Sequence, residues 1–172
     1  MAAFDFTNFK RKGNFENDIQ LNTVEEISAV VIHTTENTLR NIKIFTPDLE
    51  AEIYNNDEFR QQLLAFTRGN RHAHIQILVD DISSALQNGH KLIGLAQQLS
   101  SIITIKDTPA DYQGTHVSFI LFDQAHFVFK ADSSSHTAIS SNCKNRSNKL
   151  HEFFTLAYEH AEQNIHTRRL NI

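Results

Sequence analysis

The chain has 172 residues, of which 40% are hydrophobic and 21% are charged, with only five Gly and two Pro. This composition predicts one soluble globular domain and excludes a disordered or low-complexity chain. The formal net charge of −4 gives no electrostatic reason to expect a nucleic acid bound along a whole face. Nucleic acid is therefore not an expected partner. The net charge does not exclude a local cluster of basic residues.

No segment of the sequence has the pattern of a membrane span or a secretion signal. Its apolar runs are all shorter than the ~20 residues that cross a bilayer, and the N-terminus lacks the apolar run of a signal peptide. Cys143 is the only cysteine, so an internal disulfide is excluded. We expect a cytoplasmic protein that needs no cofactor.

The first residues differ from the rest of the chain in their patterning. Residues 1–22 show no sustained period, and we expect a flexible N-terminal lead-in before a single domain at 23–172. The letters "TVEE" at 23–26 have the form of a capping box, with Thr at the N-cap and Glu three residues later. They predict the start of a helix whose apolar positions recur through Val31.

Strands and helices alternate through the middle of the chain. The alternation in "NIKIF" (41–45) predicts a strand, and "TPDLEAEIY" predicts a short helix with Thr46 as N-cap and Pro47 as its first residue. "DEFRQQLLAFTRG" predicts a helix closed by Gly69. The remaining patterns predict a strand at 74–81, a helix at 89–99, strands at 101–107, 116–122 and 126–132, and a helix at 148–163.

This order of elements indicates the fold class. Alternating helices and strands, followed by a hairpin and a last helix, predict an α/β layered domain with a mixed β-sheet flanked by helices. The strands at 75–79 and 117–122 are apolar on both faces, so we expect them near the centre of the sheet.

The stretch "GTHVSFILFDQ" (114–124) carries polar residues within an apolar strand pattern. His116 and Ser118 share one face of the predicted strand, and Asp123 follows at its end. Buried polar side chains need hydrogen-bond partners, so this strand either has an unusual polar neighbour or keeps part of a site.

The spacing of His116, Ser118 and Asp123 resembles the H-x-K-x4-D signature of the phospholipase D-like superfamily, with Ser118 in place of the Lys. About 85% of the chain, from 23 to 170, also resembles an uncharacterised bacterial domain family with a phospholipase D-like fold. The segments that carry this second resemblance are "IFTPDLEAEIYNNDEF", "ILVDD", "GHKLIGLAQQL" and the late "RRL". Some similar proteins are fused to acetyltransferases.

The superfamily resemblance implies a role for each motif residue. It makes His116 the candidate nucleophile and Asp123 the residue that holds its tautomer, with a Lys binding the phosphate. Two copies of the motif form one site, so this single-copy chain would need a homodimer. Ser118 carries no charge, and "KAD" (130–132) replaces the superfamily's Gly-Ser…Asn pattern. We therefore expect a non-catalytic binding or scaffolding module with a degenerate motif; the alternative is a homodimeric phosphodiesterase or nuclease using His116.

A second candidate site lies before the last predicted helix. Lys144, Arg146 and Lys149 fall just ahead of or within its first turn, where backbone N–H groups favour anions. We predict an anion-binding cluster there. The expected partner is accordingly an unidentified protein or an anionic ligand.

Two further patterns are weaker. His72 and His74 share one face of a predicted strand and could begin a metal site, but no third ligand has diagnostic spacing, so no metal is expected. Asp80 and Asp81 follow the same strand at the end where open α/β sheets bind ligands. The simpler interpretation is that they cap the turn into the next segment.

Overall fold

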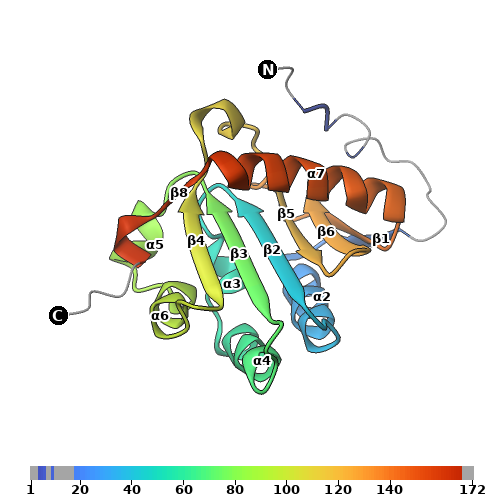
Figure 1. The fold of residues 1–172 in the computed structure, drawn as a ribbon. Coiled ribbons are helices and arrows are strands. Elements are labelled where there is room, and N and C mark those ends of the chain that lie inside the picture. The colour runs from blue at the N-terminus through green and yellow to red at the C-terminus, as the bar shows by residue number, and fades with distance from the viewer. Residues whose placement is uncertain (1–3, 7–8, 10–17, 168–172) are drawn as a thin grey trace.

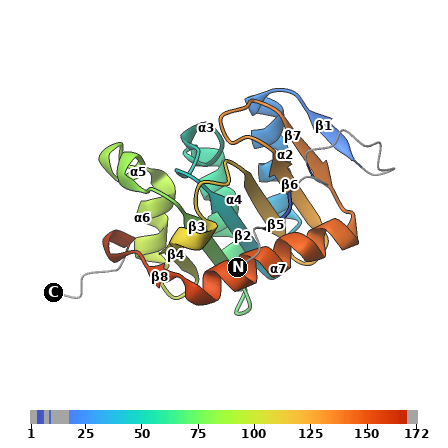
Figure 2. The ribbon, with the colours of Figure 1, turned by 90° about the horizontal axis from the view of Figure 1, so that it is seen from above.

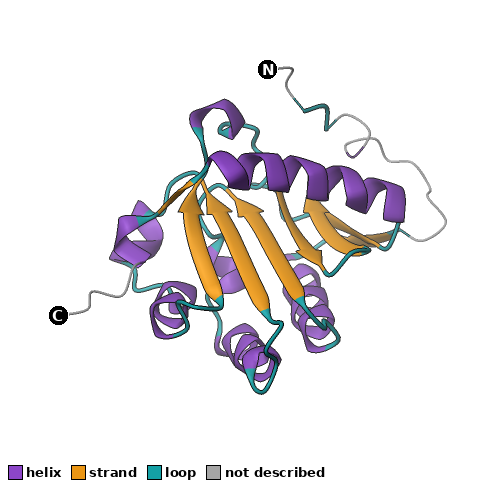
Figure 3. Cartoon of the chain, in the orientation of Figure 1, coloured by secondary structure: helices purple, strands orange, loops and turns teal. Residues whose placement is uncertain are grey.

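The computed structural model describes residues 4–6, 9 and 18–167, and in this part of the chain a single mixed sheet organises the fold (Figures 1 and 3). The strands are β1 (Ile19–Leu21), β2 (Asn41–Thr46), β3 (His74–Val79), β4 (Ile103–Asp107), β5 (Ser118–Phe122), β6 (His126–Lys130), β7 (Ala138–Ser141) and β8 (Glu162–Gln163). Their order is β1-β7-β6-β5-β2-β3-β4-β8. β2, β3 and β4 are parallel, and the other neighbours are antiparallel. The predicted mixed sheet is confirmed, with β5, β2 and β3 in its middle.

Helices cover both faces of this sheet. They are α2 (Val24–Glu36), α3 (Ala51–Tyr54), α4 (Asp57–Thr67), α5 (Ser83–Gln87), α6 (Lys91–Gln98) and α7 (Lys144–His160), with short 3-10 turns η1 (Ala110–Tyr112) and η2 (Ile165–Thr167). Seen from above, α7 crosses one face alone and α2, α4 and α6 cover the other (Figure 2). Each face has its own buried apolar layer. The layer under α7 is rich in Phe, since Phe153 and Phe154 of α7 pack on Phe45, Phe119 and Phe129 of the strands.

The described residues among the first 22 pack on the domain, which the sequence did not predict. Phe6 and Phe9 are 7% and 4% exposed and join the aromatic layer under α7. Residues 19–21 form β1, which pairs with β7 at the edge of the sheet. Aromatic residues dispersed among polar ones have no period, so only the tertiary contacts reveal that they are core. The described parts of 1–22 are therefore packed on the domain, while 10–17 lie outside the described residues.

Local signals succeeded at one helix start and failed at another. The Thr23 hydroxyl accepts the Glu26 N–H at 3.1 Å, so the predicted capping box does begin α2. The helix predicted to start at Thr46 and Pro47 instead starts at residue 51. Thr46 is fully buried as the last residue of β2, where it pairs with Val79 of β3. The strand continues because its partner is present, which the local Thr-Pro signal cannot report.

Candidate functional site

His116 lies at the carboxyl edge of the parallel strands, in the loop that leads into β5. Its side chain is exposed and its backbone has φ of 56°, a conformation that non-glycine residues adopt only when their surroundings impose it. Its carbonyl oxygen accepts the Ser133 N–H at 2.7 Å, which ties this loop to the segment after β6. The position at the carboxyl edge is where open α/β sheets bind ligands.

The carboxyl groups of Asp80 and Asp132 lie close enough to His116 for its imidazole to affect their pKa. Burial raises the pKa of Asp80, against the opposing effects of the Thr108 hydroxyl, the Gly114 N–H and His116. The Gly114 N–H donates to Asp80 Oδ2 at 3.3 Å. Hydrogen bonds from Ser134 lower the pKa of the exposed Asp132, and His116 adds a smaller contribution in the same direction. Asp81, by contrast, accepts the Ser83 N–H at 2.8 Å and caps the turn into α5, as the simpler interpretation expected.

The predicted partner of His116 lies at the other end of β5. Asp123 accepts three backbone N–H groups at 2.8–2.9 Å, from Leu39, Arg40 and Asn41. Because a strand rises about 3.3 Å per residue, the five residues of β5 keep Asp123 on the order of 17 Å from His116. The structure does not bring the two together within this chain, and Asp123 fixes the start of β2 instead.

The position of the missing motif Lys is occupied by a buried hydroxyl with a lysine directly opposite. Ser118 is 1% exposed and pairs in register with Lys130 of β6. Opposed residues of an antiparallel pair share a face, so the Lys130 side chain stands beside the motif position. This lysine comes from the "KAD" segment, and only the strand register places it there.

The Lys130 ammonium is paired with a buried carboxylate and makes two hydrogen bonds. It donates to Glu50 Oε1 at 2.5 Å and to the Ser133 carbonyl at 2.7 Å, and both charged side chains are only 7% exposed. The other oxygen of Glu50 accepts the Thr46 hydroxyl at 3.3 Å. The charge that a phosphate would need is therefore neutralised inside the protein.

A pocket of about 270 Å³ opens over this ion pair. It is lined by Asp48, Glu50, Ala51, Glu52, Ile53, Lys130, Ser133, Ser134 and His136. Three carboxylates face one ammonium and one imidazole there, and Asp80 and Asp132 flank His116 close by. The carboxyl edge around the motif is consequently an acidic surface, which opposes the binding of phosphate groups.

In the predicted anion-binding cluster, the Arg146 side chain is buried and the two Lys side chains are exposed. Arg146 is 6% exposed, and its guanidinium makes two bonds to the Asp18 carboxylate at 2.9 and 2.7 Å. It also lies 5.3 Å from the ring centres of both Phe9 and Phe127. The Arg146 side chain thus contacts Asp18 and Phe9 of the N-terminal region, and anion binding by this cluster stays a prediction. Lys144 and Lys149 are exposed on α7.

His72 and His74 are both exposed, and no group of three metal-ligating side chains occurs among the residues that the structure describes. Within the same residues, no helix has the length and apolar character to cross a membrane.

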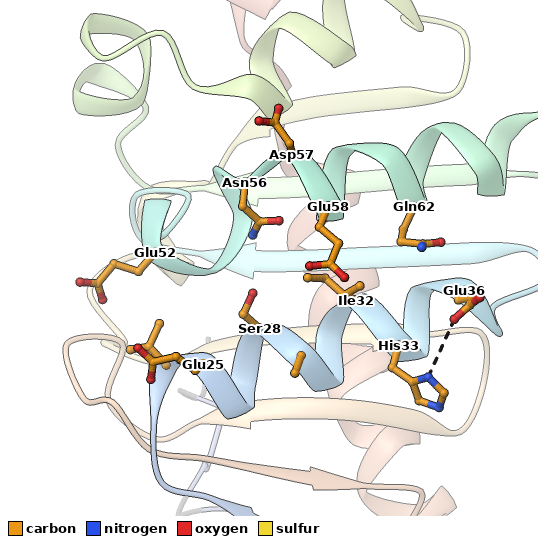
Figure 4. Close-up of a pocket in the computed structure, with 12 residues that line it drawn as sticks. Glu25, Ser28, Ile32, His33, Glu36, Glu52, Asn56, Asp57, Glu58 and Gln62 are labelled. Carbon is orange, nitrogen blue, oxygen red and sulfur yellow. Dashed lines mark ion pairs between the residues drawn. The ribbon is translucent and has the colours of Figure 1, made fainter.

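Sequence reasoning missed a groove between α2 and α4 on the other face of the sheet (Figure 4). Its volume is about 710 Å³. It is lined by Val24, Glu25, Ser28, Ala29, Ile32, His33 and Glu36 of α2, by Glu52 of α3, and by Asn56, Asp57, Glu58 and Gln62 at the start and along the side of α4. The sequence does show that both helices carry acidic residues. It does not show that the two helices lie side by side and place these residues around one groove.

Solved structures identify the class of fold. NucT from Helicobacter pylori aligns with a TM-score of 0.64 and 9% identity, over 86% of this chain and 98% of that one. The phospholipase D family member Nuc from Salmonella typhimurium aligns at 0.56 and 11%, over 79% and 89%. The archaeal chromatin protein TrmBL2, described as showing a novel mode of DNA binding, aligns at 0.60 and 13%, over 92% of this chain. The chain spans 58% of that protein's length. The fold is thus phospholipase D-like.

The chain belongs to the family described as Domain of unknown function (DUF7931), which matches residues 23–170. A comparison with curated proteins finds no match. The expected resemblance to an uncharacterised family with this fold is confirmed by these two findings together.

Proposed function

We propose that this chain is a non-catalytic phospholipase D-like domain that works as a binding or scaffolding module. One observation carries the proposal: Lys130, the cation paired in register with Ser118, is buried and neutralised by Glu50. A phosphoryl transition state gathers negative charge on its oxygens, so a site for it needs a free cation. Ser118 supplies none, and Asp80 and Asp132 add negative charge beside His116.

The position of Asp123 supports the same proposal. A nucleophilic His is normally held in one tautomer by a hydrogen-bonded partner. The Asp123 carboxylate is occupied by three backbone N–H groups at the far end of β5, so it cannot perform this task in the same chain. His116 occupies the motif position of the nucleophile, but the motif Lys is replaced by Ser118 and Asp123 lies at the far end of β5.

The second candidate is a homodimeric phosphodiesterase or nuclease that uses His116. The observation in its favour is the register that places Lys130 opposite Ser118, where it could take over the task of the motif Lys. This role requires that ligand binding separates Lys130 from Glu50. It also requires a second copy of the chain to complete the site.

Hydrolysis of bis(p-nitrophenyl) phosphate tests the proposal. We expect the purified chain, His116→Ala and the matched control His160→Ala to release nitrophenol at the rate of buffer alone. His160 is an exposed histidine at the end of α7, away from the motif. A rate that disappears in His116→Ala and in Lys130→Gln but persists in His160→Ala would establish the second candidate instead. A monomeric mass in solution would independently exclude it.

A further inference from the structure

The groove between α2 and α4 has the form of a docking site for a helix. Ser28 lies in the groove between the two helices (Figure 4), and Ala29 and the partly exposed side chains of Val24 and Ile32 also line it. Small residues let another backbone approach closely, and ridges of a third helix fit between two neighbours. Grooves of this kind recognise amphipathic helices through apolar residues at helical spacing.

The charges around the groove have one sign. Among the residues that the structure describes, the groove is lined by five carboxylates and by no Lys or Arg; the carboxylates are Glu25, Glu36, Glu52, Asp57 and Glu58. Lys91, outside the lining, is 3.0 Å from Asp57, and His33 is 3.9 Å from Glu36. Glu52 also lines the smaller pocket over Lys130, so the groove and that pocket share one acidic residue.

Helix stability explains only part of this arrangement. Glu25, Asp57 and Glu58 lie in the first turns of α2 and α4, where the helix dipole favours carboxylates. Glu36 lies in the last turn of α2, where the same dipole disfavours a negative charge. Within the helix Glu36 has His33 at 3.9 Å, and a cationic partner adds a permanent positive charge at that end.

We infer that the groove docks a basic amphipathic helix of a partner protein. The partner's apolar stripe covers Ser28, Ala29 and Ile32, and its Lys or Arg residues reach Glu25 at one end and Glu36 at the other. These two residues are eleven positions apart, which is about 16 Å along a helix or three turns of the docked partner. Charge complementarity selects this occupant over a nucleic acid or an anionic membrane, both of which the carboxylates repel. The inference rests on the proposed role as a binding module and names its partner class.

Fluorescence anisotropy with a defined probe tests the inference. The probe is a labelled helical peptide of about five turns, with a Leu stripe at i, i+3, i+4 and i+7 and Lys on both sides. A second peptide has the same composition without the stripe. We expect the striped peptide to bind at least about tenfold more tightly, and its binding to weaken as salt is raised.

Variants locate the binding. Glu25→Lys/Glu36→Lys should weaken binding by about tenfold or more, whereas Glu152→Lys/Glu159→Lys, two exposed acids on α7 over the other face, should change it less than about twofold. Ala29→Arg blocks the groove without removing a carboxylate and should also abolish binding. Thermal unfolding checks that each variant folds.

Three outcomes overturn the inference: no binding of the striped peptide, equal binding of both peptides, or equal weakening by the groove and α7 variants. None of these affects the phosphodiesterase assay, where a rate dependent on His116 would instead overturn the proposed function and leave the peptide result standing.

Discussion

The buried pair of Lys130 and Glu50 allows a direct test of the proposal that the motif is inactive. Replacing Glu50 by Gln preserves the side-chain shape but leaves the ammonium without a counter-ion in a site where both side chains are 7% exposed. Removing one partner of a buried pair costs about 3–5 kcal/mol, a large part of the roughly 5–15 kcal/mol that stabilises a domain. The expected result is a large drop in the free energy of unfolding, measured by urea denaturation.

The double variant Glu50→Gln/Lys130→Met separates the charge effect from packing. It leaves no unpaired charge, so it should be more stable than Glu50→Gln alone, and the double-mutant cycle should give a coupling of at least about 2 kcal/mol. Added salt should change this coupling little, because both charged side chains are only 7% exposed. A cost below about 1 kcal/mol for Glu50→Gln would mean that Lys130 is solvated, as in an exposed pair. In that case the Lys130 ammonium would be available to bind a phosphate beside Ser118, and the argument for an inactive site would be refuted.

Three further predictions concern other parts of the fold. Asp123→Asn should lower the free energy of unfolding by about 2 kcal/mol or more, because three N–H groups lose a charged acceptor; an unchanged urea midpoint would contradict this. Arg146→Met should leave Asp18 buried and unpaired and expose the N-terminal segment to limited proteolysis, whereas Lys149→Met should not. Burial lowers the pKa of His90 below its ordinary 6.5, so the unfolded chain binds more protons as pH falls through that value. Stability should fall between about pH 7 and 5.5, by up to about 1.4 kcal/mol per pH unit from this residue, and a His90→Asn variant should show a shallower decline in urea unfolding.

Local patterns in the sequence were enough to predict most of the elements and the class of fold. Apolar periodicity predicted α4 and α6 and the central strands, because burial of one helix face or both strand faces leaves a local pattern. The Thr23 capping box is also local, since its hydrogen bond spans only three residues. The frame of His116, Ser118 and Asp123 correctly indicated a phospholipase D-like fold.

The side chains around the motif come from distant parts of the chain, so they could be identified only from the tertiary structure. Lys130 reaches Ser118 through strand register, and Glu50 reaches Lys130 from eighty residues away, so neither contact leaves a periodic signal. Arg146 pairs with Asp18, which lies 128 residues earlier in the chain, although the residues next to Arg146 resemble an anion-binding site. The groove between α2 and α4 likewise exists only because two separate helices pack on the same face of the sheet. The energy of a charge pair depends on the distance between the two charges in space. The ion-pair partners around this site are therefore set by the fold and not by neighbours in the sequence.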